Sequence, residues 1–158
     1  MLIDKKQQAA PLLGLPDEHL QVVRHAMWEV VNGDGTAGAS RLAVPGVEMC
    51  GKTGTAQVRR ITGGQRGQSG DWKYRDHGLF VFFAPYDKPR YAGSVVIEHG
   101  LGGAHAAAPV AKDVLTHLFD PPAAAKRLAE LEAGWGGTLA ERMARRDAAI
   151  EAASRATA

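Results

Sequence analysis

Several features that mark particular protein classes are scarce or missing in this chain of 158 residues. Cysteine occurs once, at Cys50, so no intrachain disulfide can form, and a single cysteine suits a reducing compartment and an oxidising one equally. The longest apolar runs cover residues 79–85 and 95–97, whereas a membrane helix needs roughly 20 apolar residues. The N-terminal residues include no apolar stretch of the kind found in signal peptides. We therefore expect neither an export signal nor a membrane anchor in this segment, and no membrane contact of its own.

The chain also has no large excess of positive or negative charge. The formal net charge is +2, 23% of the residues are charged and 45% are hydrophobic, which is ordinary globular composition. Because the basic residues form no block, nucleic acid is not an expected partner. None of the six histidines stands at a spacing typical of a metal site, so we expect no metal and no cofactor. The length suits one domain of ordinary size.

Apolar periodicity predicts a helix near the N-terminus and a strand after it. Residues 1–16 are polar and interrupted by proline and glycine, which is typical of a lead-in loop. A helical pattern then begins at Asp17, a plausible N-cap, and ends at Gly33. A strand is predicted through residues 47–58, where two interrupting glycines are typical of close backbone approach. Residues 62–76 have no apolar period, which predicts a long exposed loop.

Two further strands and a second helix follow. Residues 77–84 and 90–99 are rich in β-branched and aromatic side chains, and the short segment between them predicts an antiparallel hairpin. Residues 106–119 have helical periodicity and are followed by Asp120 and two prolines, which end the helix. We expect the Ala/Arg/Glu-rich residues 121–158 to lie outside the core, as an exposed helix or a disordered tail. The predicted fold class is α+β, an antiparallel sheet of about three strands flanked by helices.

Residues 46–55, GVEMCGKTGT, contain the densest chemistry of the chain and match two incompatible motifs. The first is the phosphate-binding loop of nucleotide-binding proteins, which would use Lys52 and Thr53 to bind phosphates and Mg²⁺. That loop needs a buried strand before it and a helix after it. Pro45 interrupts the preceding strand, glycine and β-branched residues occupy the start of the required helix, and Glu48 would repel phosphate. Nucleotide binding is therefore kept as the alternative.

The second motif is Lys52-Thr53-Gly54-Thr55 on a strand at the edge of a cleft. A cation and two hydroxyls suit the recognition of a terminal carboxylate, and Gly54 lets a substrate backbone lie against the strand. Strand alternation places Thr53 with Thr55 on one side and Lys52 with Gly54 on the other, although the twist of an edge strand can bring neighbouring side chains together. The motif resembles the Lys-Thr-Gly box of penicillin-binding proteins and serine β-lactamases.

The segments around this box make the resemblance more specific, because several spaced motifs occur in the family's order. They are residues 32–37 (NGDGTA), 76–80 (DHGLF), 83–86 (FAPY), 95–100 (VVIEHG) and 108–111 (APVA). Over residues 18–120 the chain resembles the closing part of a class B penicillin-binding transpeptidase of the cell-elongation type, penicillin-binding protein 2. The resemblance implies a partial penicillin-binding/β-lactamase-like fold, in which residues 17–120 form the C-terminal part of the transpeptidase domain and the sheet belongs to a larger one.

In that family a serine forms an acyl-enzyme with the D-Ala-D-Ala end of a peptidoglycan stem peptide, and β-lactams acylate the same serine. The resemblance implies that Lys52 supplies positive potential and helps to organise proton transfer. It implies that Thr53 and Thr55 bind the substrate carboxylate beside Gly54, and that the Thr55 backbone N–H donates to the oxyanion. Stem peptides and β-lactams are then the implied ligands, and the remainder of the transpeptidase domain is the implied partner. The implied location of the full-length family is the periplasmic face of the inner membrane.

Two of the family's catalytic boxes are missing from the sequence. No lysine has a serine three residues before it, so the nucleophile box Ser-x-x-Lys is absent. The only asparagine, Asn32, has Val30 two positions before it, so the box Ser-x-Asn is absent too. We therefore expect the chain to be inactive alone, as a gene fragment or one half of a split protein would be. A non-enzymatic remnant that binds cell-wall synthesis partners is a further alternative.

Three other residues have simpler explanations than catalysis. Cys50 could be a nucleophile, but a lone cysteine in an apolar strand is more often a core residue. His77 beside Asp76 is expected to form a structural hydrogen bond. Trp72 could either line a substrate groove or pack on the surface.

Overall fold

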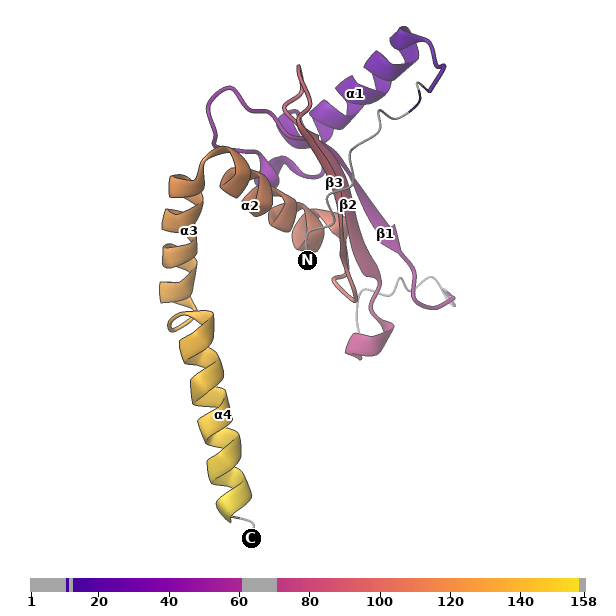
Figure 1. The fold of residues 1–158 in the computed structure, drawn as a ribbon. Helices are drawn as coiled ribbons and strands as arrows, with labels where there is room; N and C mark the ends of the chain where they lie inside the picture. The colour runs from indigo at the N-terminus through magenta and orange to yellow at the C-terminus, as the bar shows by residue number, and fades with distance from the viewer. Residues whose placement is uncertain (1–10, 12, 61–70, 157–158) are drawn as a thin grey trace.

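The computed structural model describes residue 11, residues 13–60 and residues 71–156. Its centre is an antiparallel sheet of three strands, β1 (Cys50–Ala56), β2 (His77–Ala84) and β3 (Tyr91–Ile97). The long helices are α1 (Asp17–Asn32), α2 (Ala108–Phe119), α3 (Pro121–Gly134) and α4 (Leu139–Ala156). Helix α2 lies against the sheet, whereas α3 and α4 lead away from it as an elongated arm (Figure 1). The predicted α+β class, an antiparallel sheet flanked by helices, is confirmed.

Three short helical segments connect these elements. They are η1 (Gly38–Ser40), η2 (Trp72–Tyr74) and the π-helical turn η3 (Gly103–Ala107), which runs directly into α2. The helix predicted over residues 106–119 is therefore α2 with the end of this turn. Helix α1 begins at Asp17 as predicted, but Pro16 occupies the N-cap position without a side-chain hydrogen bond, so the N-cap role expected of Asp17 is wrong. Most of the predicted loop at 62–76 lies outside the described residues.

Strand β2 is the central strand and pairs with β1 on one side and β3 on the other. In this register Thr53 of β1 lies opposite Phe80 of β2, and Phe80 lies opposite Val95 of β3. Residues directly opposite one another share a face of the sheet. The register therefore decides which side chains of β1 lie over the core and which face away from it.

One face of the sheet is buried by η3 and α2. Phe80 is fully buried, and its ring lies 6.3 Å from that of Phe82, centroid to centroid. The side chains that η3 and α2 contribute to the same core cluster are mostly small: Ala107, Ala108, Ala111 and Leu115. Because alanine adds little bulk, the helix backbone can come close to the phenylalanine rings. Gly51 makes room within the sheet, since a Cβ atom there would lie 2.2 Å from the Phe80 ring.

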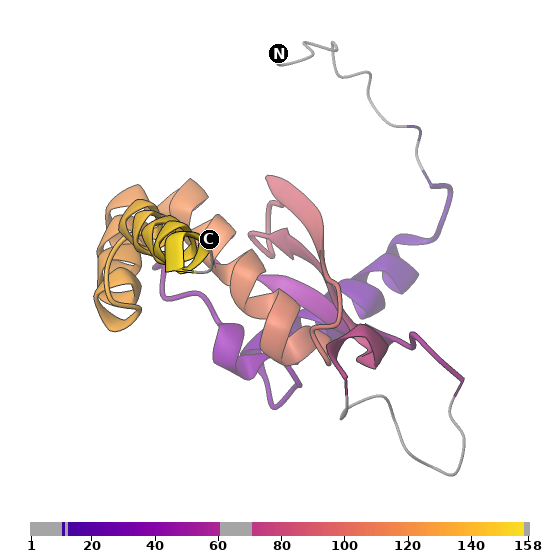
Figure 2. The same ribbon diagram turned by 90° about the horizontal axis from the view of Figure 1, so that it is seen from below.

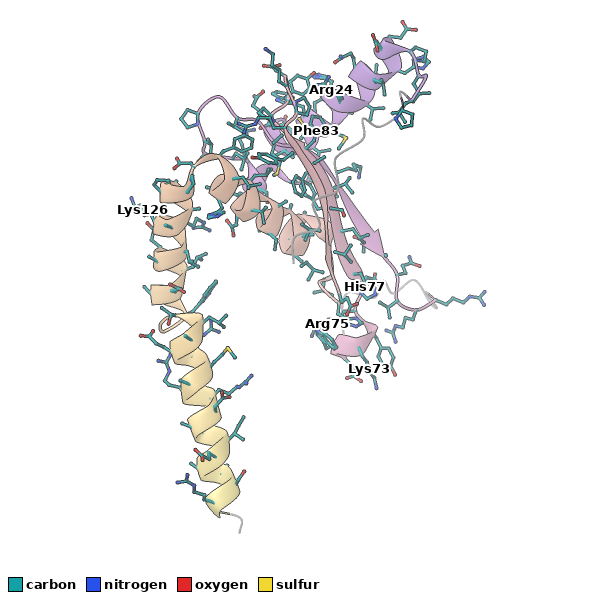
Figure 3. The ribbon with its side chains drawn as sticks, in the orientation of Figure 1. Arg24, Lys73, Arg75, His77, Phe83 and Lys126 are labelled. Carbon is teal, nitrogen blue, oxygen red and sulfur yellow. The ribbon has the colours of Figure 1, made fainter. Side chains whose placement is uncertain are left out.

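On the opposite face, Arg24 of α1 packs near the start of β1. The guanidinium of Arg24 lies 5.7 Å from the centre of the Phe83 ring and 5.4 Å from that of Tyr86, and Figure 3 shows Arg24 and Phe83 together at this end of the sheet. Farther along the same face, Val81 is 46% exposed and Val96 is 57% exposed. Part of this face is therefore an open apolar surface.

The Ala/Arg/Glu-rich end of the chain forms α3 and α4, which extend away from the sheet in Figure 1 and lie to one side of it in the end-on view of Figure 2. Asp120 caps α3, because its carboxylate accepts the Ala123 N–H at 3.0 Å. Thr138 and Glu141 form a capping box at α4, with hydrogen bonds of 2.8 and 3.3 Å. The Thr138 N–H lowers the pKa of the Glu141 carboxyl. Every described residue of these helices is at least partly exposed, and no helix within the described ranges is both long and apolar enough to cross a bilayer.

The assignment of the two sheet faces can be tested with neighbouring substitutions in β2. Phe80→Ala should lower the free energy of unfolding by about 3–5 kcal/mol, because it leaves a cavity where a fully buried ring packs against η3 and α2. Val81→Ala, on the open face, should change it by less than about 1 kcal/mol. Urea unfolding of the whole chain, followed by circular dichroism, measures both. Equal effects of the two substitutions would contradict the assignment.

Candidate functional site

The motif Lys52–Thr55 lies in the middle of β1, which is an edge strand of the sheet. Lys52 and Thr55 are exposed, and Thr53 and Gly54 are half-buried. Among the described strands β1 pairs with β2 alone, so its outer edge retains backbone groups that can pair with an extended ligand. The strand thus presents a cation, two hydroxyls and an open backbone edge together.

This geometry contradicts the phosphate-binding-loop interpretation. Gly51, Lys52 and Thr53 are extended and pair with residues 82, 81 and 80 of β2. Strand β1 continues to Ala56, so the lysine does not lead into a helix. A phosphate-binding loop works because its N–H groups converge on the ligand at a helix N-terminus. The Gly-Lys-Thr match therefore has no structural basis for nucleotide binding.

The ammonium of Lys52 is available to a ligand. Its Nζ donates a hydrogen bond to the Thr53 backbone oxygen at 2.8 Å. The ion pairs found among the described residues do not include Lys52. Because an ammonium has three donors, two remain for an incoming anion.

A third hydroxyl lies beside the motif. Thr36, in the loop after α1, places its Oγ1 atom 2.9 Å from Oγ1 of Thr53. Residues 32–37 belong to the motifs that carry the family resemblance, but the sequence assigns no role to Thr36. Its spacing from Thr53 gives no sign of the contact, because the contact depends on how the loop folds back across β1. Thr36 is therefore the site residue that sequence reasoning missed.

The glycine-rich turn before α2 supports the motif from the core side. A Cβ atom on Gly103 would lie 2.0 Å from the Leu79 oxygen and 2.8 Å from the Gly54 oxygen. A Cβ atom on Gly78 would lie 2.7 Å from the Gly102 oxygen. Backbone therefore packs directly on backbone here, and this contact fixes the position of Gly54 relative to η3.

Two histidines fasten the end of the sheet beyond the motif, where Figure 3 labels His77. The His99 N–H donates to Nδ1 of His77 at 2.9 Å, and a carboxylate oxygen of Asp76 accepts the Val58 N–H at 3.4 Å. Asp76 and His77 thus each bond to another segment, in place of the mutual hydrogen bond expected from the sequence. The Trp72 ring packs on His99 with 4.2 Å between centroids. These contacts are structural.

Cys50 is a core residue. Its side chain is fully buried, and burial raises the pKa of its thiol to about 12, with a smaller contribution from the nearby carboxylate of Glu48. A thiol with this pKa is neutral at physiological pH and is not an activated nucleophile. Within the described ranges no three His, Cys, Asp or Glu side chains gather as metal ligands would.

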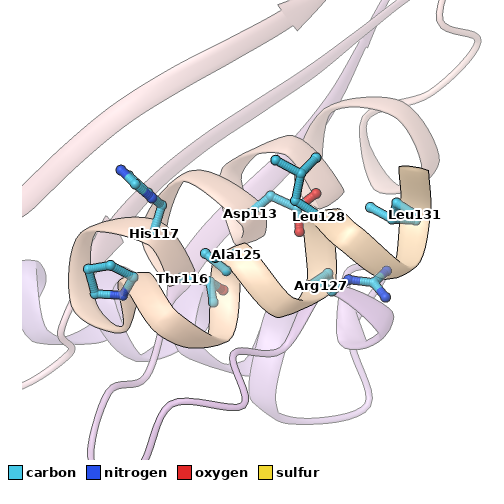
Figure 4. A pocket seen from close by; sticks show the side chains of 9 residues that line it. Asp113, Thr116, His117, Ala125, Arg127, Leu128 and Leu131 are labelled. Atoms are coloured by element: carbon cyan, nitrogen blue, oxygen red, sulfur yellow. The ribbon is translucent and has the colours of Figure 1, made fainter. Parts of the chain in front are cut away.

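A pocket opens between α2 and α3, on the arm side of the molecule (Figure 4). Its lining comes from these two helices alone: Asp113, Thr116, His117, Pro121, Ala124, Ala125, Arg127, Leu128 and Leu131. The pocket therefore does not belong to the site on β1.

Comparison with known proteins identifies the family to which this chain belongs. Residues 4–116 match the penicillin-binding protein transpeptidase domain. The peptidoglycan D,D-transpeptidase MrdA of Acinetobacter baumannii is 44% identical over 93 residues, which are 58% of this chain and 13% of that protein. MrdA of Salmonella typhimurium is 32% identical over 117 residues, covering 73% of this chain and 18% of that protein. The chain thus spans less than a fifth of the length of these curated relatives.

Two solved structures are similar as well. Penicillin-binding protein 2 of Pseudomonas aeruginosa, in complex with WCK 5153, is 37% identical with a TM-score of 0.50, over 68% of this chain and 20% of that one. Penicillin-binding protein 2 of Helicobacter pylori, in complex with MreC, is 32% identical with a TM-score of 0.57, over 73% of this chain and 21% of that one. The chain belongs to the penicillin-binding protein transpeptidase family. Within that family it is a C-terminal part of a transpeptidase of the penicillin-binding protein 2 type.

The support of Gly54 by the glycine-rich turn can be tested with adjacent glycines. Gly103→Ala should destabilise the chain by about 1–3 kcal/mol, because the new methyl group overlaps backbone atoms that cannot move independently. It should also shift the amide NMR resonances of Gly54 and Leu79. Gly102→Ala is the matched control, since a Cβ atom there meets nothing within 4 Å and its φ of −169° suits alanine. Similar stabilities and β1 spectra for the two variants would show that the turn does not support the strand.

Proposed function

We propose that Lys52–Thr55 form the carboxylate-binding wall of a D,D-transpeptidase site. Thr53 and Thr55 donate hydrogen bonds to the terminal carboxylate of a D-Ala-D-Ala stem peptide, or to the carboxylate of a β-lactam. Lys52 adds positive potential and helps to organise proton transfer, and the Thr55 N–H contributes one oxyanion donor. The observation that carries this proposal is the combination, on one open strand edge, of an ammonium that has no acidic partner among the described residues and of hydroxyls on the same strand.

The reaction itself requires a serine from the rest of the transpeptidase domain. The serine oxygen bonds to the carbonyl carbon of the penultimate D-alanine, and the peptide bond to the last D-alanine breaks, releasing that residue with a proton on its amine. An amine of a neighbouring stem peptide then displaces the serine and forms the cross-link. To these reaction steps this chain contributes substrate-binding groups and positive charge. The nucleophile box is absent from the chain.

The rest of the domain is also the proposed occupant of the open sheet face. Val81 and Val96 are about half exposed there, and β3 is a second edge strand. An apolar sheet face of this kind is normally buried against another layer. We assign residues 17–120 to the transpeptidase domain and residues 121–158 to a region outside it. The complete protein would act at the periplasmic face of the inner membrane.

The carboxylate-binding role can be measured on the full 158-residue chain. N-acetyl-D-Ala-D-Ala should shift the amide NMR signals of β1 more strongly than the same dipeptide with a C-terminal amide. Thr53→Val and Thr55→Val should each weaken binding of the acid about tenfold, because a hydrogen bond to a charged group contributes about 1.5 kcal/mol or more. Thr116→Val is the matched control, since the Thr116 hydroxyl donates to the Lys112 carbonyl within α2.

If the acid and the amide produce the same shifts on β1, the carboxylate wall does not exist as proposed. If Thr116→Val weakens binding as much as Thr55→Val, the hydroxyls of β1 are not the groups that bind the acid.

A further inference from the structure

Thr36 lies outside the motif of β1 but shares its hydroxyl chemistry. Its Oγ1 atom is 2.9 Å from that of Thr53, at the surface of the molecule. From this contact we infer that Thr36 is a positioning residue that makes Thr53 selective for a carboxylate. The inference rests on the function proposed for Lys52–Thr55 and adds a specificity determinant to it.

The backbone on either side of Thr36 is anchored to α1. A Cβ atom on Gly35 would lie 2.3 Å from the Val30 Cα atom, so Gly35 lies directly on the last turn of the helix. Ala37 is only 1% exposed, and its N–H donates to the Val30 oxygen at 2.9 Å. Because both neighbours are fixed, Thr36 has little freedom to move away from Thr53.

The end of α1 is in turn tied to the segment that enters β1. The Asn32 side-chain amide donates to the Trp28 oxygen at 3.1 Å and to the Met49 oxygen at 2.9 Å. The Arg41 guanidinium donates to the Asn32 carbonyl oxygen. These bonds join the helix end, the loop that carries Thr36 and the start of β1 into one unit. The two hydroxyls are therefore held together by structure outside the pair itself.

The direction of the hydrogen bond follows from the chemistry of the ligand. Each hydroxyl has one proton. An ionised carboxylate only accepts hydrogen bonds, so Thr53 must donate its proton to the carboxylate. The Thr53 oxygen then accepts the proton of Thr36. Accepting from Thr36 occupies one of the two lone pairs of the Thr53 oxygen and leaves the Thr53 O–H directed at the incoming group.

Selectivity arises from this fixed direction. A terminal carboxylate has two acceptor oxygens, whereas a terminal amide has one acceptor and one donor group. Without the Thr36 proton, the Thr53 hydroxyl can turn either way and serve the amide as well as the acid. Loss of Thr36 should therefore reduce discrimination between acid and amide, which a purely structural contact would not do.

The test compares acid and amide binding to the full chain and its variants. The probes are N-acetyl-D-Ala-D-Ala and its C-terminal amide, followed through the β1 amide signals. Thr36→Val should lower the ratio of the two affinities about three- to tenfold, which corresponds to one hydroxyl hydrogen bond. Thr36→Ser keeps the hydroxyl and should restore the wild-type ratio. Thr36→Ala removes the hydroxyl with less bulk and should behave like the valine variant.

The outcomes separate this inference from the proposed function. If the wild-type chain prefers the acid, and both Thr36→Val and Thr36→Ala keep the wild-type ratio, the positioning role is wrong while the carboxylate wall stands. If Thr36→Ser fails to restore the ratio, the hydroxyl is not the responsible group, and the inference is again wrong. If the wild-type chain shows no preference for the acid, the proposed function fails, and the inference fails with it.

Discussion

The ladder between β1 and β2 is the interaction on which the site depends. It places Thr53 opposite Phe80, and Phe80 is fully buried under η3 and α2. A slip of one residue would turn every side chain of β1 to the other face, exchanging the sides of Lys52 and Thr53. Because Phe80 cannot leave the core without a large loss of stability, the core sets the register, and the register sets the arrangement of the cation and the hydroxyls.

Small residues allow the layers around this ladder to approach closely. Gly51 leaves space for the Phe80 ring, and Gly103 lets the turn before α2 rest on the backbone at Gly54. On the other side of the motif, Gly35 lets the Thr36 loop dock on α1. The edge strand is thus fixed by contacts on its backbone and core side, while its ammonium and hydroxyls remain accessible. A binding site benefits from this combination, because its groups are oriented before a ligand arrives.

Much of this arrangement could be predicted from the sequence. The β-branched and aromatic runs predict β2 and β3, and the ordered motifs around Lys52 indicate the transpeptidase family. The N-cap of α1 could not be predicted correctly. Aspartate is a preferred N-cap residue and Asp17 lies at the start of the helix, yet Pro16 occupies the N-cap position. The sequence also could not predict the contact of Thr36 with Thr53 or the close approach of Gly103 to Gly54. Both join segments far apart in the chain, and they depend on tertiary packing, which local periodicity does not encode.

The central proposal is that this chain supplies the carboxylate-binding wall of a serine transpeptidase site. A chimera tests it most directly: residues 17–120 replace the segment of the Pseudomonas aeruginosa penicillin-binding protein 2 that they match, and the remainder of that protein would contribute the serine that the family uses. The account predicts that fluorescent penicillin labels the chimera covalently and does not label this chain alone. A correctly folded chimera that stays unlabelled, or labelling of this chain by itself, would contradict the account.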